Sequence, residues 1–288
     1  MKIDHLVAQI REKQSFLCVG LYTDLEKIPA HLRAVEDPLF EFNKAIIDAT
    51  ADYCVAYKPN LAFYEAYGVK GWRSLERTIA YLNQSYPDHF TIADAKRGDI
   101  GNTAERYAEA FYNGLGFDSV TLSPYMGSDA IEPFLKQEEK YPIVLALTSN
   151  KGAEDFQYHG TDGATLFEQV IRTTQNYSNS ERVMYVVGAT KADRLKEIRS
   201  LAPDAFFLVP GVGAQGGDLK AVYDNGKNDS VGLLVNSSRG IIYASSGQDF
   251  AEAAANSAKE LQEQMKSLLD SESCYITLPT PRLIVISG

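Results

Sequence analysis

Short apolar runs alternate with longer amphipathic stretches along most of the chain, and this alternation predicts its secondary structure. Eight runs rich in Val, Ile, Leu and Phe have the length and composition of strands buried on both faces. They are Phe16–Leu21, Cys54–Tyr57, Thr91–Ala95, Ser119–Leu122, Ile143–Thr148, Met184–Val187, Phe206–Val209 and Val231–Val235. Helical spacing between and after them predicts helices over Leu39–Thr50, Trp72–Gln84, Thr103–Gly114, Ala130–Lys140, Gly163–Asn176, Ala192–Leu201, Leu219–Asp224 and Phe250–Leu269.

Eight β/α alternations without a linker-like break predict an α/β protein that is a single (β/α)8 TIM barrel. We expect residues 1–270 to form one catalytic barrel domain and residues 271–288 to form a C-terminal tail of unknown role. Within that tail, Leu283–Ile286 fits either a short strand or an apolar segment packed on the barrel. An open doubly wound sheet is the alternative, but no G-x-G-x-x-G motif opens the first βα turn.

Composition narrows the class of protein. A formal net charge of -10 argues against a general nucleic-acid binder or a binder of anionic membranes, although a small phosphorylated ligand needs only a local positive site. No signal-peptide pattern and no run of about 18 apolar residues occurs, so we expect neither secretion nor a membrane span. The three cysteines, Cys18, Cys54 and Cys274, are far apart, which favours a reducing cytoplasm over a disulfide framework.

The histidines and acidic residues show no metal-binding or Ser/His/Asp pattern. His5, His31, His89 and His159 are scattered, and we interpret all four as non-catalytic. We therefore expect no metal and no cofactor.

The segment Thr91–Thr103 carries the most distinctive charges in the chain. Asp94 and Lys96 are two residues apart in an extended run, so their side chains should lie side by side at a strand end. Asp99, in the turn beyond, could bring a second carboxylate near the same ammonium. The alternative is a salt-bridged strand end without chemistry, because structural ion pairs are common.

Other polar residues also follow predicted strands, which is where βα loops build the active site of such a barrel. Lys58 follows the second strand, Ser149 and Asn150 follow the fifth, and Asp24 follows the first. Each has a simpler interpretation: a lysine with a buried stem and an exposed amine, two residues that cap the next segment, and a plain loop residue.

The last two strand ends together suggest a phosphate site. After Pro210, the segment 211–217 contains four glycines, and glycines let backbone N–H groups approach an oxyanion closely. Ser238 and Arg239 follow the final strand, and arginine is a fork-shaped donor suited to phosphate. A flexible turn plus a surface arginine is the alternative, but these two loops are the usual phosphate position in the fold.

With these residues assembled, the chain resembles the orotidine 5′-phosphate decarboxylase family, in its bacterial branch with longer chains. The D-x-K-x-x-D-I-x-x-T signature of that family stands here as Asp94, Lys96, Asp99, Ile100 and Thr103, and P-G-V-G-A-Q-G-G begins at Pro210. The resemblance covers roughly Ser15 to Leu269.

The resemblance implies a cytoplasmic carboxy-lyase that converts orotidine 5′-phosphate to UMP and CO2 in the last step of de novo pyrimidine nucleotide synthesis. It implies that Lys96 protonates C6 of the pyrimidine, and that Asp94 lies beside the substrate carboxylate. It also implies a homodimer in which Asp99 enters the neighbouring subunit's site. The remaining implied contacts to substrate involve Lys58, Ile100, Thr103, Ser149, Asn150, Pro210, Gln215, Ser238, Arg239 and Asp24.

One position departs from the family pattern. The family usually has a ribose-contacting aspartate where this chain has Tyr22, which puts in question whether Asp24 can reach the sugar. Two other functions stay open beside the decarboxylase, and Tyr22 motivates the second of them. One is a magnesium-dependent sugar-phosphate decarboxylase or aldolase-like relative, and the other is a nucleotide-binding protein that has lost catalysis.

Overall fold

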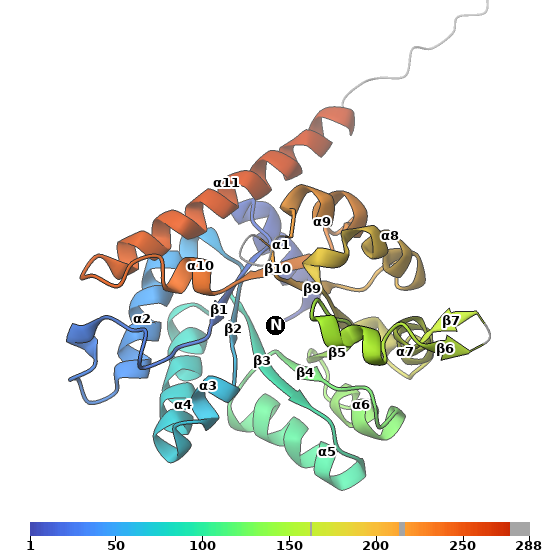
Figure 1. Ribbon diagram of the computed structural model, residues 1–288, viewed down its shortest axis with the longest axis horizontal. Helices are drawn as coiled ribbons and strands as arrows, with labels where there is room; N and C mark the ends of the chain where they lie inside the picture. Colours follow the sequence, from blue (N-terminus) through green and yellow to red (C-terminus); the bar gives the residue numbers. More distant parts are fainter. Residues whose placement is uncertain (162, 213–216, 277–288) are drawn as a thin grey trace, which may run out of the picture.

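The chain forms a closed barrel of eight parallel strands in the computed structural model, which describes residues 1–161, 163–212 and 217–276 (Figure 1). Around the barrel the strands follow the order β1-β10-β9-β8-β5-β4-β3-β2. Because every pairing within it is parallel, the carboxyl ends of all its strands lie on one rim. The bounds are β1 (Leu17–Leu21), β2 (Ala56–Pro59), β3 (Phe90–Arg97), β4 (Ser119–Leu122), β5 (Tyr141–Leu147), β8 (Met184–Val187), β9 (Phe207–Pro210) and β10 (Leu233–Ser237).

Helices surround the barrel and connect its strands (Figure 1). They are α1 (Ile3–Lys13), α2 (Pro38–Thr50), α3 (Ala62–Glu65), α4 (Gly68–Ser85), α5 (Gly101–Ala108), α6 (Ser128–Leu135), α7 (Leu166–Thr174), α8 (Ala192–Leu201), α9 (Leu219–Gly226), α10 (Arg239–Ile242) and α11 (Phe250–Ile276). A π-helical segment, Glu109–Gly114, continues α5. Short 3-10 turns occupy Ala30–Leu32, Ala51–Tyr53, Lys151–Asp155, Ser180–Arg182 and Ala189–Lys191.

The core lies both inside the barrel and between the barrel and its helices. Strands β1, β2, β4 and β8 are buried at every residue, as expected where one face fills the barrel and the other packs on helices. Helix α4 buries residues at helical spacing, including Gly71, Leu75 and Leu82. Each fully buried large apolar side chain contributes roughly 1.5–3 kcal/mol relative to exposure. Such a core holds the rim residues on a rigid support.

The predicted TIM barrel is confirmed, with differences at strand ends. The second strand runs from Ala56 through Lys58 to Pro59, so Lys58 lies inside the strand and not after it. The last strand begins at Leu233, later than predicted, because Val231 and Gly232 have φ angles of 68° and 61° and form a turn. Left-handed backbone of this kind ends strand pairing.

The helices that were not predicted are α1 and the short α3 and α10, and the antiparallel pair of β6 (Gly160–Thr161) and β7 (Ala164–Thr165) was not predicted either. In α1 the buried residues include Leu6 and Ile10, one turn apart. The Met1 ammonium lies 2.6 Å from Asp118 Oδ1, just before β4, so α1 packs at the amino-terminal end of the barrel. The β6–β7 pair projects from the side of the molecule (Figure 1).

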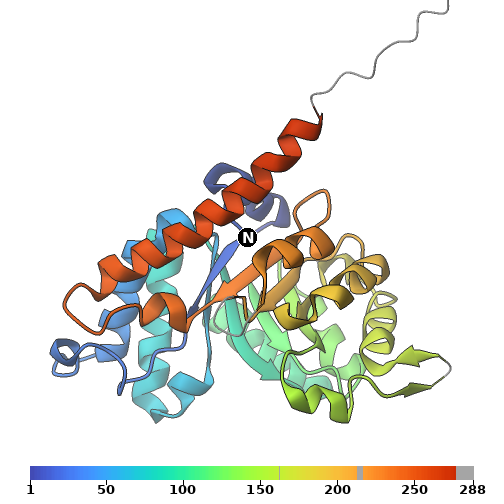
Figure 2. The same ribbon diagram turned by 45° about the horizontal axis from the view of Figure 1, so that its top comes forward.

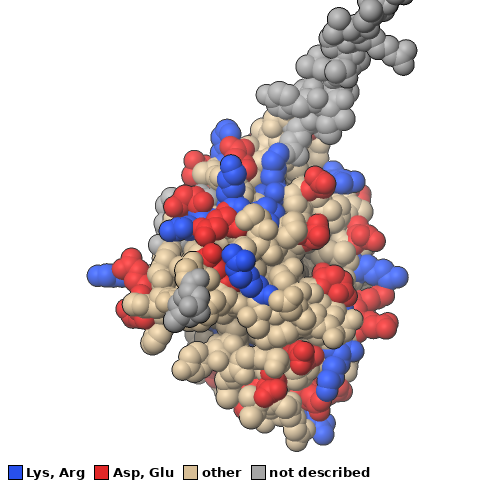
Figure 3. Space-filling view, turned by 90° about the vertical axis from the view of Figure 1, so that its right-hand side faces the viewer, with Lys and Arg blue, Asp and Glu red and all other residues tan. Residues whose placement is uncertain are grey.

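Helix α11 packs on α2 and α10, and its far end extends beyond the barrel (Figure 2). It ends at Ile276, later than the predicted end at Leu269. The tail segment Leu283–Ile286 lies outside the described residues. Within the described part of the chain, no helix combines the length and apolar character needed to cross a membrane. Basic and acidic side chains are interspersed on the face that Figure 3 shows.

Candidate active site

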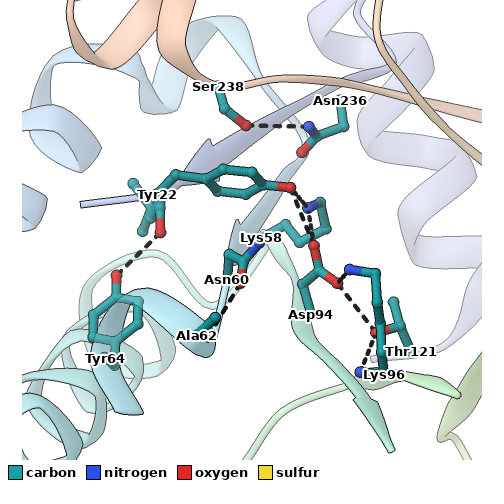
Figure 4. Close-up of polar contacts among 11 residues, drawn as sticks. Tyr22, Lys58, Asn60, Ala62, Tyr64, Asp94, Lys96, Thr121, Asn236 and Ser238 are labelled. Atoms are coloured by element: carbon teal, nitrogen blue, oxygen red, sulfur yellow. Dashed lines mark hydrogen bonds and ion pairs between the residues drawn. The ribbon is translucent and has the colours of Figure 1, made fainter. Parts of the chain in front are cut away.

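A row of charged side chains lies at the carboxyl ends of β2 and β3 (Figure 4). Lys58 Nζ donates a 2.6 Å hydrogen bond to Asp94 Oδ2, and Lys96 Nζ donates to Asp94 Oδ1. The two-residue spacing in an extended segment predicted that Asp94 and Lys96 would meet, and the structure brings them together. Each carboxylate oxygen of Asp94 therefore faces one ammonium group.

The two ammonium groups differ in exposure. The side chain of Lys58 is 2% exposed and that of Asp94 is 5% exposed, whereas the side chain of Lys96 is 51% exposed. Burial alone would raise the pKa of Asp94, but the charges of Lys58 and Lys96 outweigh it and hold that pKa well below its usual range. Burial alone would lower the pKa of Lys58, but the Asp94 carboxylate raises it above its ordinary value. The buried pair is thus ionised, and Lys96 is the ammonium that a ligand can reach.

Lys96 adopts a backbone conformation that is unusual for a residue with a side chain. Its φ is 46°, and the pairing of β3 with β4 changes register between Ala93 and Arg97. The Lys96 N–H donates a 2.9 Å hydrogen bond to Thr121 Oγ1, whose hydroxyl in turn lies 3.3 Å from Asp94 Oδ1. Left-handed backbone at a non-glycine residue costs on the order of 1–3 kcal/mol and persists where surrounding contacts fix it. This local distortion aims the Lys96 amine back at Asp94.

Tyr22, which follows β1 directly, completes the cluster. Its hydroxyl accepts a 2.6 Å hydrogen bond from Lys58 Nζ and donates a 3.1 Å bond to Asp94 Oδ2 (Figure 4). The Lys58 amine also lies 4.5 Å from the centroid of the Tyr22 ring, and that ring stacks on Phe63. The phenol therefore covers Lys58 and accounts for part of its burial.

Asp24 does not join this cluster. Its carboxylate accepts hydrogen bonds from the Glu26 N–H at 3.0 Å and the Tyr67 hydroxyl at 3.4 Å, and it lies 3.4 Å from Lys27 Nζ. The Asp24 N–H donates to the Tyr243 hydroxyl, which itself donates to the Tyr22 carbonyl. Asp24 thus fixes the loop after β1, while Tyr22 takes the place next to the charges.

The expectation that Asp99 would lie near the Lys96 ammonium of its own chain is wrong for the described residues. Asp99 Oδ1 instead accepts a 2.7 Å hydrogen bond from the Ile100 N–H, at the entrance to α5. Among the described residues Asp99 forms no ion pair. Ile100 is 48% exposed, and Thr103 is exposed on the first turn of α5. Ile100 and Thr103 are thus exposed near the rim, and Asp99 between β3 and α5 is half-buried.

Ser149 and Asn150 lie in the loop after β5. Ser149 Oγ is buried and has no hydrogen-bond partner among the described residues. It packs on Gly188, where an added Cβ would lie 2.1 Å from this Oγ, so only glycine fits there. Asn150 is exposed, and its side-chain oxygen accepts a 2.6 Å hydrogen bond from the Thr148 hydroxyl. Ser149 therefore presents a hydroxyl that the fold itself leaves unpaired.

The predicted phosphate loops are described only in part. Pro210 ends β9, but Gln215 and the rest of residues 213–216 lie outside the described residues. Ser238 lies before α10 and its hydroxyl accepts a 3.2 Å hydrogen bond from Asn236 Nδ2. Arg239 begins α10, is exposed, and forms no ion pair in the described part of the chain. The guanidinium is thus available to an anion at the end of β10.

Three polar groups at this rim were not predicted as site residues: the Tyr22 hydroxyl, Thr121 and Asn236. Asn236 is 5% exposed, and its Oδ1 has no partner among the described residues. A sequence signal existed for Asn236, because it is a polar residue at the end of an apolar strand. Thr121 had none, because a threonine inside a strand is ordinary, and the hydrogen bonds of Tyr22 depend on three-dimensional placement.

No group of three or more His, Cys, Asp or Glu side chains that could hold a metal ion occurs in the described part of the chain. Cys18 and Cys54 are buried and free. His89 is buried against Lys13, before β3 and away from the charge row. At the charge row the described residues offer two ammonium groups and one fixed carboxylate.

Comparisons with known proteins agree with this geometry. A family model described as "Orotidine 5′-phosphate decarboxylase / HUMPS family" matches residues 17–254. The orotidine 5′-phosphate decarboxylase of Flavobacterium johnsoniae is 60% identical over 272 residues, covering 94% of this chain and 100% of the relative. That of Bacteroides fragilis is 56% identical over 270 residues, covering 93% of this chain and 98% of the relative.

Among solved structures, the OMP decarboxylase of Leishmania donovani superposes with a TM-score of 0.80 at 36% identity, covering 93% of this chain and 99% of that one. The family match spans more than half of the chain, and the relatives cover nearly all of it. The barrel, the charge row on β2 and β3, and these relationships lead to one assignment: the chain belongs to the orotidine 5′-phosphate decarboxylase / HUMPS family.

Proposed function

We propose that this protein is a carboxy-lyase that decarboxylates orotidine 5′-phosphate to UMP and CO2 without a cofactor, in the cytoplasm. The observation that carries the proposal is the Lys58–Asp94–Lys96 row at the barrel rim, in a chain of this family. Residues 1–270 would form the catalytic domain. The role of residues 271–288 is left open.

Lys96 is the proposed proton donor. When the C6–carboxylate bond breaks, CO2 leaves and the electron pair stays on C6, where no neighbouring π-system delocalises it. The Lys96 ammonium stabilises that charge and transfers a proton to C6, and the neutral amine then regains a proton from solvent. Reactions this slow require roughly 20 kcal/mol of differential stabilisation or more. A half-exposed ammonium held on a buried carboxylate is already oriented for the transfer.

Asp94 would hold Lys96 in place and oppose the substrate carboxylate. Its low pKa keeps it ionised at neutral pH, so a second carboxylate placed beside it meets a negative charge, one that Lys58 and Lys96 already share. Loss of CO2 relieves this repulsion, so the interaction raises the ground state more than the transition state. Lys58 would act mainly through Asp94, because Tyr22 covers its amine.

The remaining rim residues would bind the substrate. Arg239 and Gln215 would hold the phosphate with Pro210 and Ser238 beside them, and the unpaired Ser149 hydroxyl would meet the pyrimidine amide edge next to Asn150. Thr103 would approach the ribose hydroxyls; the family resemblance gives Lys58 the same contact, but in this chain the Tyr22 hydroxyl takes that place on its amine. Asp24 would support this region through the loop after β1. Phosphate binding far from C6 can supply energy for closing the site, so a substrate without phosphate should lose rate as well as affinity.

We also propose a homodimer with shared active sites. The Asp99 carboxylate binds the Ile100 N–H and forms no ion pair among the described residues, and the Ile100 side chain is exposed. Ile100 (48% exposed), Tyr125 (90%) and Met126 (48%) are large apolar side chains left open in loops on the same rim. Apolar groups of this size are typical of interface cores. A partner covering them would receive Asp99 next to its own Lys96.

The decarboxylase proposal is tested by following loss of the orotate absorbance of orotidine 5′-phosphate in the presence of EDTA. We expect turnover that EDTA does not reduce. Lys96→Ala should abolish turnover while binding of UMP stays measurable, since Lys96 is half exposed and its loss leaves the fold intact. Turnover by Lys96→Ala at the wild-type rate would contradict the role of Lys96. A requirement for added magnesium would favour a metal-dependent sugar-phosphate relative.

A nucleotide-binding protein without catalysis is the second candidate, and Tyr22 is the observation that favours it. The phenol occupies donors and acceptors of Lys58 and Asp94 that a substrate could otherwise use. Tight UMP binding without turnover in the wild-type chain would select this function.

The shared active site has a test of its own. Mixing inactive Lys96→Ala chains with inactive Asp99→Ala chains should restore activity, because one hybrid site regains both residues.

A further inference from the structure

A second basic cavity lies outside the charge row, between the loop after β1 and the start of α4. It has a volume of about 680 Å³, within the range of small-molecule sites. One wall comes from residues between 25 and 39, which lead into α2, and the other from Tyr67 and the first turns of α4. These two helices pack side by side (Figure 1). We call it the rim cavity, because both walls follow strands on the carboxyl-terminal side of the barrel.

The rim cavity is positive in a chain whose net charge is -10. Four cationic side chains and two acidic ones line it, namely Arg33, Lys70, Arg73 and Arg77 against Glu36 and Asp37. Asp37 is already paired, since its Oδ2 lies 2.6 Å from Arg77 Nη1. What remains is three cations against Glu36. Such a local excess attracts a multiply charged anion, even on an acidic protein.

The three remaining cations, Arg33, Lys70 and Arg73, have hydrogen-bond donors without a partner among the described residues. In the described part of the chain, the side chains of Lys70 and Arg73 form no ion pair and no hydrogen bond. Arg33 uses Nε and Nη2 to bind the carbonyls of Glu26 and Ile28, at distances from 2.6 to 3.2 Å. These bonds fix the plane of the Arg33 guanidinium and leave its Nη1 without a partner among the described residues. A pre-oriented guanidinium loses less entropy when it binds a phosphate.

The cavity also has an apolar side. Leu25, Leu39 and Tyr67 contribute to its lining, and Leu39 is 3% exposed. The Tyr67 hydroxyl accepts a 3.1 Å hydrogen bond from the Leu25 N–H, which fixes the ring at the cavity wall. An inorganic anion would not use such a wall. An anion attached to a planar organic group would use both the cations and the aromatic ring.

We propose that the rim cavity binds a nucleoside polyphosphate, with its phosphates on Arg33, Lys70 and Arg73 and its base against Tyr67. Lys70 and Arg73 are three residues apart on α4, so their side chains share one face of the helix. Arg33 lies on the opposite wall, and cations on two walls suit a chain of phosphates better than a single one. This site is separate from Lys96 and Arg239, and the proposal does not depend on decarboxylase activity.

The test is isothermal titration calorimetry with inorganic tripolyphosphate, which has as many phosphates as UTP, and separately with UTP. Titrations use the full chain carrying Arg239→Ala, so that the predicted phosphate loop of the active site does not compete. Lys70→Gln/Arg73→Gln removes two charges from the cavity. The matched control is Lys259→Gln/Lys266→Gln, which removes two charges from exposed positions on α11. Far-UV circular dichroism checks that both double variants are folded.

We expect one UTP per chain, at least tenfold weaker binding of UTP in Lys70→Gln/Arg73→Gln, and a change below twofold in the control. UTP should bind more tightly than tripolyphosphate, because only UTP has a base to pack on Tyr67. Equal UTP affinity in the two double variants would overturn the proposal, as would the absence of UTP binding at millimolar concentration. Equal affinity for UTP and tripolyphosphate would overturn the nucleoside part of it. None of these outcomes depends on the result of the decarboxylase assay, so either proposal can fail without the other.

Discussion

The buried pair of Lys58 and Asp94 gives the sharpest test of how the charge row is held. Asp94→Asn keeps the shape of the side chain but removes its negative charge. Among the described residues, the Lys58 ammonium, at 2% exposure, then keeps only neutral acceptors, which are the amide oxygen of the new side chain and the Tyr22 hydroxyl. An ammonium without a counter-ion in this position is poorly solvated.

Breaking a buried ion pair by removing one partner costs about 3–5 kcal/mol, because the other charge is left uncompensated. Replacing both partners should cost less, so Lys58→Met/Asp94→Asn should be more stable than Asp94→Asn alone. An exposed pair on α9 provides the control: Lys220 and Asp224 have side chains 70% and 49% exposed. Asp224→Asn should cost at most about 0.5 kcal/mol.

The pH dependence of the stability of Asp94→Asn gives a second, independent test. In the wild-type chain, Asp94 raises the pKa of Lys58 above its ordinary value, so that contribution to stability is complete below pH 10.5 and is lost only above it. Without Asp94, burial prevails and lowers the pKa of Lys58 below its ordinary value. The unfolded chain then binds more protons than the folded one, so stability of the variant should rise between pH 7 and 9.5.

Urea unfolding followed by fluorescence of Trp72, the single tryptophan, and by far-UV circular dichroism measures these differences. A cost below 1 kcal/mol for Asp94→Asn would refute the reasoning. So would a double variant that is no more stable than Asp94→Asn, or a variant whose stability does not rise with pH relative to wild type. Either result would mean that water or a rearranged side chain compensates the Lys58 charge.

Three further substitutions test other parts of the structure by the same urea assay. Tyr22→Phe removes a hydrogen bond from Lys58 while keeping the ring, and should cost about 1.5–3 kcal/mol; unchanged stability would show that the hydroxyl is dispensable. Burial and the neighbouring lysine lower the pKa of His89 from 6.5 to about 4, so its contribution is present above pH 6.5 and lost toward pH 4. Between pH 6.5 and pH 4, the free energy of unfolding of the wild-type chain should therefore fall by about 3 kcal/mol more than that of His89→Gln. Parallel pH profiles would contradict this. Gly71→Ala places a Cβ 1.9 Å from the Tyr64 carbonyl oxygen and should lower the free energy of unfolding by about 1–3 kcal/mol. A urea midpoint equal to that of the wild-type chain would show that α3 shifts freely.

The fold and much of the charge row could be predicted from the sequence because they depend on periodicity. Apolar runs alternating with helical patterns predict a barrel, and the carboxyl ends of its strands meet on one rim. Asp94 and Lys96 are two residues apart on one strand, so their contact follows from strand geometry alone. Lys58 could be placed beside them because β2 neighbours β3.

Contacts that depend on loops could not be predicted in this way. The sequence places both Tyr22 and Asp24 after β1, and nothing in their order says which one reaches the charge row. The structure decides it through Tyr67 and Tyr243, which bind Asp24 and hold it in the loop. Asp99 was placed by its distance along the chain from Lys96, but its carboxylate binds the N–H of the next residue instead.

The two lysines of the charge row differ in exposure, and the buried one helps to restrict the position of the exposed one. An ammonium that donates a proton must be reachable, and Lys96 is half exposed; an exposed lysine on a flexible stem would normally sample many rotamers. Its position is restricted because Asp94 is itself immobile, held by Lys58, Thr121 and Tyr22 inside the barrel wall. The buried pair thus contributes orientation more than stability, which is consistent with the small net energy of buried ion pairs. Substitutions of Lys58 should therefore lower the rate constant of turnover more than they weaken binding of UMP, because they loosen the orientation of the Lys96 amine.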